Sequence, residues 1–131
     1  MILDASAALS VILNEEEGSV VLPCLIKHRR SLNMSVIGRW EITAKIFVLD
    51  EPQLDDVLDR FDEAFPCRLI DVDREQLSLA THAWKTYGKK SGHKAKLNMG
   101  DCFAYALTKL RDEPLLFIGN DFSQTDVRSA L

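Results

Sequence analysis

The chain has 131 residues, of which 47% are hydrophobic and 27% are charged, and its formal net charge is −4. Glycine and proline are too sparse for a disordered or fibrous chain, and no apolar run approaches the length of a membrane span. We therefore expect one globular domain over residues 1–131. The negative net charge also argues against a uniformly basic nucleic-acid-binding surface.

The cysteines and the N-terminal residues indicate the compartment. Cys24, Cys67 and Cys102 are odd in number, and no two of them have the spacing of a zinc ribbon or a redox motif. The opening letters MILD contain no basic segment of the kind that begins a signal peptide. These features favour the cytoplasm, with no membrane as a partner.

Short apolar runs alternate with helical patterns along the whole chain, which predicts repeated β–α units. In chain order we expect a strand over 1–3, helices over about 6–13 and 18–27, a strand over 31–35, helices over 36–49 and 54–65, a strand over 67–72, helices over 74–87 and 101–110, and a strand over 114–120. This order predicts a three-layer α/β/α sandwich around a central, mostly parallel sheet of four to five strands.

Three acidic residues are expected at one edge of this sheet. Asp4 directly follows the first strand and Asp121 follows the last, and open α/β sheets form their sites beyond the carboxyl ends of the strands. Asp101 lies in the first turn of its helix, where the helix dipole stabilises an anion by about 0.3–1 kcal/mol.

A fourth acid, Glu41, lies on the helix over 36–49. Its spacing places it on a stripe that is expected to face the core, together with Ile37, Ala44 and Val48. A buried carboxylate needs a partner, and neighbouring carboxylates repel unless a cation neutralises them. An oxygen-rich cluster of this kind favours Mg²⁺ or Mn²⁺ over zinc.

Each acid also has a purely structural explanation. Asp4 and Asp101 would serve as helix caps, and Asp121 would form an Asx-turn. Glu41 would turn to solvent at the edge of its stripe. Capping is the simpler explanation for Asp101 taken alone, but local roles do not explain why four acids should converge.

Four segments carry a resemblance to a known family: ILDASAAL, SVIGRWE ending at Glu41, YGKKSGHKAKLNMGDCFAYALTK and LLFIGNDFSQTDV. Over essentially its whole length, the chain resembles the PIN-domain ribonucleases, and within them the VapC toxins of bacterial type II toxin–antitoxin pairs. Two departures stand out. Gly38, Arg39 and Trp40 replace the small aliphatic residues that usually precede this glutamate, and Ala5 stands where threonine is frequent.

The resemblance implies a PIN-like fold and a metal-dependent endoribonuclease that cleaves RNA phosphodiester bonds. It implies a catalytic quartet of Asp4, Glu41, Asp101 and Asp121. Within it, Asp4, Asp101 and Asp121 bind Mg²⁺ (or Mn²⁺), and Glu41 either binds the metal or positions water. Such ions activate water for attack on the phosphodiester.

Two further residues match the family pattern as secondary site residues. Ser6 matches a small hydroxyl residue that bonds a metal-bound carboxylate or water, although a helix N-cap explains it equally well. Asp126 matches an acid that is often present beside the site, and this match is weaker.

The segment KTYGKKSGHKAK supplies the candidate RNA contacts. Lys89, Lys90 and Lys94 are expected to approach the RNA backbone, where lysine positions a substrate without reading its sequence. The alternative is a solvated surface loop without a ligand.

The resemblance also implies a cognate VapB-like antitoxin and a homodimer. An arginine of the antitoxin would pair with the acidic pocket, while an antitoxin helix would lie in an apolar groove between the early helices. Val20, Val21 and Leu25 are expected to be surplus to the core and available for such contacts.

Two other functions share part of this pattern. A phosphatase with an aspartyl nucleophile usually has a second acid two residues after the first, where this chain has Ser6. A non-catalytic PIN-fold module that binds protein or RNA would be indicated if one acid of the quartet were missing, but all four are present.

Overall fold

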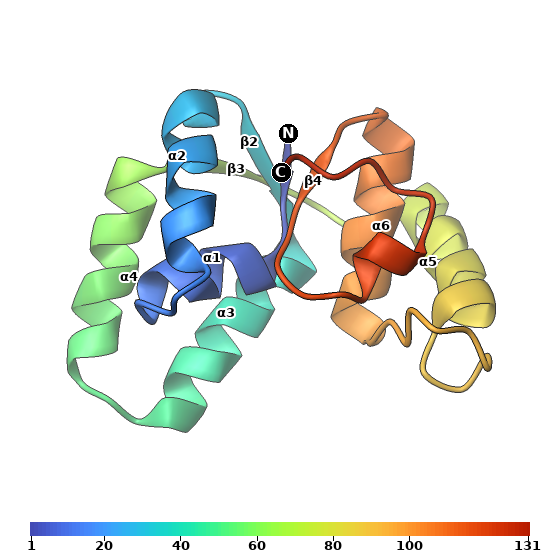
Figure 1. Cartoon of the computed structure of the whole chain (residues 1–131), viewed down its shortest axis with the longest axis horizontal. Helices are drawn as coiled ribbons and strands as arrows, with labels where there is room; N and C mark the ends of the chain where they lie inside the picture. Colours follow the sequence, from blue (N-terminus) through green and yellow to red (C-terminus); the bar gives the residue numbers. More distant parts are fainter.

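A four-stranded sheet forms the middle layer of the computed structural model, which describes residues 1–131 (Figure 1). Its spatial order is β3-β2-β1-β4, and every pair of neighbouring strands is parallel. The strands are β1 (Ile2–Leu3), β2 (Leu32–Ser35), β3 (Cys67–Ile70) and β4 (Leu115–Leu116). Their carboxyl ends therefore share one edge, and the predicted α/β sandwich with a parallel sheet is confirmed.

Helices cover both faces of the sheet (Figure 1). One face carries α1 (Ala5–Ile12), α2 (Gly18–His28), α3 (Val36–Leu49) and α4 (Gln53–Ala64), and the other carries α5 (Arg74–Tyr87) and α6 (Met99–Arg111). All six helices lie within two residues of the predicted ranges. None of them combines the length and the apolar character needed to cross a bilayer.

The alternation of side chains along the strands separates the two cores. Leu3 and Leu116 point into the cluster under α1–α4, whereas Ile2 and Leu115 point into the cluster under α5 and α6. The last strand is shorter than the predicted 114–120, because pairing with β1 ends at Leu116 and the chain then bends at Gly119, whose φ is +98°.

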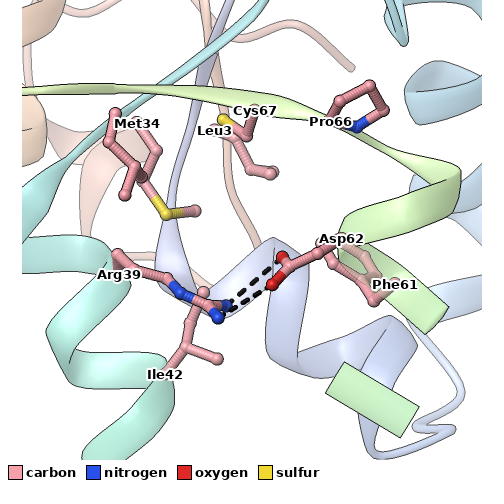
Figure 2. A pocket seen from close by; sticks show the side chains of 9 residues that line it. Leu3, Met34, Arg39, Ile42, Phe61, Asp62, Pro66 and Cys67 are labelled. Atoms are coloured by element: carbon pink, nitrogen blue, oxygen red, sulfur yellow. Dashed lines mark hydrogen bonds and ion pairs between the residues drawn. The ribbon is translucent and has the colours of Figure 1, made fainter. Parts of the chain in front are cut away.

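An ion pair joins two helices of the first layer. Both terminal nitrogens of Arg39 on α3 donate to the carboxylate of Asp62 on α4, at 2.8 and 3.3 Å (Figure 2). The pair borders an apolar pocket of about 330 Å³ whose lining includes Leu3, Met34 and Phe61. Arg39 therefore has a structural partner away from the acidic residues at the sheet edge.

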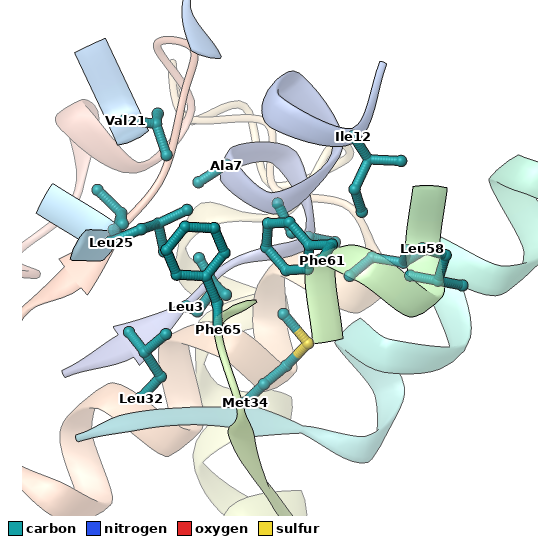
Figure 3. Packing of buried hydrophobic residues seen from close by; sticks show 14 of the residues in the cluster. Leu3, Ala7, Ile12, Val21, Leu25, Leu32, Met34, Leu58, Phe61 and Phe65 are labelled. Carbon is teal, nitrogen blue, oxygen red and sulfur yellow. The ribbon is translucent and has the colours of Figure 1, made fainter. Parts of the chain in front are cut away.

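The core beneath α1–α4 is filled by large side chains from these four helices and from the sheet (Figure 3). The rings of Phe61 and Phe65 lie 5.2 Å apart and pack toward the sheet. Val21 and Leu25 are fully buried in this cluster, so the prediction that they are surplus to the core is wrong. Of the three residues, only Val20 is exposed, because the side of α2 that carries Val21 and Leu25 faces the core.

Candidate active site

A cleft of about 320 Å³ lies at the carboxyl edge of the sheet and contains three of the four predicted acids. Asp4 comes from the end of β1, Glu41 from α3 and Asp101 from the first turn of α6. These residues are remote in sequence, and the parallel sheet brings them together. Trp40 and Lys45 of α3 also line the cleft.

Asp4 is held rigidly where β1 meets α1. Its side chain is only 5% exposed, and its Oδ2 accepts from the backbone N–H of Ser6 at 3.0 Å and from the Ser6 hydroxyl at 2.5 Å. It is the N-cap of α1, so the capping explanation is correct as far as it goes. Burial nevertheless raises the pKa of this carboxyl, and the charge of Asp121 raises it further. Asp4 thus caps α1 but has no cation to balance its charge in the cleft.

Ser6 connects the first and last strands. Besides donating to Asp4, its Oγ accepts from the backbone N–H of Ile118 at 3.1 Å. The explanation of Ser6 as a helix N-cap is wrong, because α1 already begins at Ala5 and Asp4 occupies the cap position. Ser6 instead fixes the Asp4 carboxylate against the chain that follows β4.

Asp101 and Asn98 form a reciprocal capping box at the start of α6. The Asp101 carboxylate accepts from the Asn98 N–H at 2.6 Å, and the Asn98 side chain accepts from the Asp101 N–H at 2.9 Å. Burial raises the pKa of Asp101 to about 6. The hydrogen bond from Asn98 lowers this pKa, and the neighbouring charge of Asp4 raises it. The charge of Lys89 also lowers this pKa, so the basic segment lies within electrostatic reach of the cleft.

Glu41 is partly buried, and the pKa of its carboxyl is raised. Burial, followed by the charges of Asp4 and Asp101, raises it to about 7. Its carboxylate lies against Gly100, where an added Cβ would overlap the carboxylate atoms. The sequence patterns do not single out Gly100. Its signal was a glycine inside a helix and next to an acid, where alanine would have favoured the helix by about 1 kcal/mol.

The predicted orientation of α3 is wrong. The side of the helix that faces the core carries Gly38, Ile42 and Ile46, whereas Val48 is 77% exposed. The expected stripe through Val48 is therefore turned away from the core. Glu41 lies seven residues before Val48, on the same side of the helix, and is at the cleft wall instead of in the apolar interior.

Asp121 and Asp126 lie in the same C-terminal segment and have different surroundings. Asp121 precedes the short 3-10 helix η1 (Phe122–Gln124), is exposed and makes no side-chain cap, so the suggested Asx-turn is not observed. It does not line the cleft, but its charge raises the pKa of both Asp4 and Asp101.

Asp126 is instead paired on α6. It lies 2.8 Å from the Lys109 ammonium and accepts from the Tyr105 hydroxyl at 2.9 Å. Partial burial would raise its pKa, but these two hydrogen bonds outweigh burial and hold the pKa below its ordinary value. The structure does not bring Asp126 into the cleft.

The predicted lysines lie on the segment that joins α5 to α6. Lys89, Lys90 and Lys94 are all exposed and form no ion pair within the chain. The base of the segment is closed by two backbone hydrogen bonds, from Lys89 to Leu97 at 3.1 Å and from Leu97 to Tyr87 at 2.9 Å. The lysines are thus displayed from an anchored loop, and the charge of Lys89 reaches Asp101 of the cleft.

The donor set of the cleft fits a hard divalent cation in type and charge. The acids offer only carboxylate oxygens, which suit Mg²⁺ and Mn²⁺. Burial and the mutual repulsion of these acids raise their pKa values, and none of them forms an ion pair within the chain. No three His, Cys, Asp or Glu side chains are close enough to form a complete metal-binding group.

Comparisons with known proteins identify the family. The PIN domain model matches residues 1–128. The VapC ribonuclease Mb2780c of Mycobacterium bovis and ribonuclease VapC42 of Mycobacterium tuberculosis are each 36% identical over 130 residues, covering 99% of this chain and 98% of the relative. Ribonuclease VapC28 of Mycobacterium tuberculosis is 34% identical over 131 residues, covering 100% and 98%. The chain belongs to the PIN-domain family, among the VapC ribonucleases.

Proposed function

We propose that the chain hydrolyses RNA in the cleft formed by Asp4, Glu41 and Asp101, with Asp121 as the fourth acid. Family membership makes it a VapC-type ribonuclease, the toxin of its toxin–antitoxin pair, and PIN-domain ribonucleases generally use divalent metal ions. One observation carries the assignment of the site. Three carboxylates with raised pKa values share one cleft, and no protein cation is paired with any of them.

The hydrogen bonds of the cleft suggest how the roles are divided. Asp4, Asp101 and Asp121 would hold Mg²⁺ or Mn²⁺, while Glu41 would bind the metal or orient water. Ser6 fixes Oδ2 of Asp4 and Asn98 fixes Oδ2 of Asp101, so each aspartate is pre-oriented before it binds a cation. When bound, the divalent cation supplies acidified water and offsets the charge that develops on the phosphate. Lys89, Lys90 and Lys94 would hold the RNA backbone across the mouth of the cleft.

Cleavage of total RNA with and without a metal chelator tests the proposal. The purified chain should cut RNA in Mg²⁺ or Mn²⁺ and should lose this activity in excess EDTA. Sequencing of the new RNA ends would then define the substrate and the cleavage position. Cleavage that persists in EDTA would refute the metal-dependent mechanism. RNA binding without cleavage would favour the non-catalytic PIN-fold module.

A VapC ribonuclease implies a VapB antitoxin as partner, and we infer two contacts for it. An arginine of the antitoxin would occupy the acidic cleft, because guanidinium stays charged and bonds carboxylate in a bidentate manner. An antitoxin helix would lie along α2, where Leu22 and Ile26 are exposed next to a cleft of about 480 Å³ between α1 and α2. Co-expression with the small protein encoded beside the chain should give a stable complex. Ile26→Asp should weaken this complex without affecting cleavage.

We further propose a homodimer that acts in the cytoplasm. Phe47 and Val48 on the outer side of α3 are 83% and 77% exposed, which is unusual for adjacent large apolar residues. The three cysteines are free, as expected in a reducing compartment. Sedimentation analysis should show a dimer for the native chain and a monomer for Phe47→Ser. A monomeric native chain at micromolar concentration would contradict the dimer.

A further inference from the structure

Trp40 is an exposed aromatic residue inside the acidic cleft. It immediately precedes Glu41 on α3, lines the cleft with Asp4 and Asp101, and is 61% exposed. Its indole belongs to none of the aromatic or cation–π pairs of the molecule. A large flat apolar surface is therefore presented beside the carboxylates without any partner within the chain.

A lysine lies on the same wall of the cleft. Lys45 is four residues after Glu41, which places it one helical turn further along the same side of α3. It is exposed and forms no ion pair with any acid of the chain. The cleft thus combines an aromatic face, three carboxylates and an unpaired ammonium group.

RNA has the chemistry that matches this combination, since its backbone is anionic and each nucleotide carries a flat base. We infer that Trp40 stacks on the base of a nucleotide next to the scissile phosphate, while Lys45 contacts a neighbouring phosphate. This inference rests on the proposed function of the cleft. Stacking on an aromatic side chain requires a base that has left its own stack, so the nucleotide at this position must be unpaired.

The other exposed apolar residues of α3 do not fit a nucleobase in the same way. Phe47 lines a separate depression together with three acids, Asp50, Glu51 and Asp55. That depression lacks any lysine or arginine in its lining, so it would repel an RNA backbone. Trp40 is distinguished from Phe47 by its place among the acids of the cleft and by the nearby ammonium of Lys45.

Fluorescence of Trp40 tests the inference directly. The chain has two tryptophans, so Trp84→Phe leaves Trp40 as the only one, and Trp84 lies outside the acidic cleft. This variant is mixed in a stopped-flow cell, in Mg²⁺, with a 12-nucleotide single-stranded RNA of mixed sequence. The comparison probes are the blunt duplex of that strand and a strand of abasic ribose phosphates. The single strand should quench the fluorescence before cleavage, and the duplex and the abasic strand should not.

Steady-state kinetics provide the second readout. Trp40→Leu keeps the apolar bulk but lacks an aromatic face, and it should raise KM for the single strand by roughly tenfold with a smaller change in kcat. Trp40→Phe keeps an aromatic face, so its KM should stay close to the wild-type value. Lys45→Gln should raise KM and reduce the dependence of binding on salt. A wild-type KM for Trp40→Leu, or equal quenching by duplex and single strand, would overturn the inference. The inference would also be overturned if substitution of Trp40 changed only dimer formation or antitoxin binding and left RNA binding unchanged.

The stacking and the proposed function fail in different ways. Quenching by the single strand without any cleavage in Mg²⁺ would refute the proposed hydrolysis and support stacking. EDTA-sensitive cleavage without quenching would support the hydrolysis and refute stacking.

Discussion

The acids of the cleft and the two acids paired with basic residues of α6, Glu113 and Asp126, belong to the same fold but have opposite electrostatic surroundings. Glu113 accepts a hydrogen bond from Arg111 at 2.8 Å, and Asp126 pairs with Lys109 at 2.8 Å. The pKa of each is lowered, because these partners, and for Glu113 also the N-terminal ammonium of Met1, outweigh the effect of burial. In the cleft, Asp4, Glu41 and Asp101 have raised pKa values and no cationic partner.

The difference shows which carboxylates have a complete structural explanation. An acid paired with a lysine or arginine stabilises the fold without any outside ligand. Asp4 and Asp101 cap two helices, but the cleft acids have no cationic partner, so the burial of their charges and the repulsion between them disfavour the folded state until a cation binds. Capping and metal binding are therefore compatible roles for Asp4 and Asp101, and the alternatives posed by the sequence are not exclusive.

The largest expected effect is the loss of a cleft charge. Asp101→Asn should reduce cleavage by roughly 10³-fold, since metal-dependent stabilisation of the transition state is worth several kcal/mol. The fold should persist, because the asparagine oxygen still accepts from the Asn98 N–H. Asp59→Asn, on the exposed side of α4, removes the same charge away from the cleft and should cleave normally. Single-turnover cleavage rates distinguish these outcomes, and equal rates for the two variants would contradict the site.

Gly100→Ala should disturb the cleft without weakening the helix. The new Cβ would displace the Glu41 carboxylate, and we expect a 10- to 100-fold loss of cleavage, roughly the cost of moving a residue that orients a metal ligand. Alanine favours the helix by about 1 kcal/mol, so the melting temperature should not fall. Gly38→Ala is the matched control, because its Cβ meets only the flexible side chain of Met34 at 3.3 Å. Full activity in Gly100→Ala would show that the position of Glu41 is unimportant.

The basic segment should contribute to binding and not to the chemical step. Replacing Lys89, Lys90 and Lys94 with glutamine should reduce the salt slope of single-stranded RNA binding by about 2, at about 0.7 per phosphate contact. A charge-matched control replaces Lys27, Arg29 and Arg30 at the end of α2, on exposed positions away from the cleft. Titrations at several salt concentrations provide the slopes. Identical slopes in the two triple variants would show that the segment is a solvated surface loop that does not contact RNA.

Sequence reasoning predicted the fold well because the strand–helix alternation and the helix lengths are local patterns. It also placed Asp4 and Asp101 correctly, since both lie at element boundaries whose positions follow from capping and strand ends. It failed where the answer depends on tertiary contacts. The rotation of α3 is fixed by packing of Ile42 and Ile46, which a stripe through Val48 does not reveal.

Two contacts of the folded chain, one inside the cleft and one outside it, could not have been found by local patterns at all. The space that Gly100 leaves for Glu41 involves two helices 59 positions apart in the sequence. The pairing of Asp126 with Lys109 and Tyr105 likewise depends on how the C-terminal segment packs on α6. Both are relations between distant residues, and a single sequence without the fold does not contain them.

Stability should depend on pH in the direction set by the cleft acids. Their pKa values are higher in the folded than in the unfolded chain, with Glu41 rising from 4.5 to about 7, so the folded state binds more protons between these values. Stability in EDTA should therefore be greatest near pH 5 and fall as the pH rises to 8, lowering the melting temperature by roughly 3–6 °C. Glu41→Gln should flatten this dependence, and Mg²⁺ should stabilise the wild type most at pH 8. A melting temperature that rises from pH 5 to 8 in EDTA would contradict the raised pKa values.

The smallest effect is expected at Asp126, and it separates the two groups of acids most sharply. Asp121 and Asp126 are both exposed and only five residues apart, but only Asp126 has a cation partner. Asp126→Asn should cost less than about 1 kcal/mol, because the ion pair with Lys109 is exposed to solvent and asparagine can still accept from the Tyr105 hydroxyl. Its cleavage rate should equal that of the wild type, whereas Asp121→Asn should be impaired if its charge helps to hold the metal. Measuring the cleavage rates of both variants at several Mg²⁺ concentrations shows which of the two aspartates helps to hold the metal. If Asp126→Asn needs more Mg²⁺ and Asp121→Asn does not, the two residues exchange roles, and an internal cation partner no longer distinguishes structural acids from those of the site.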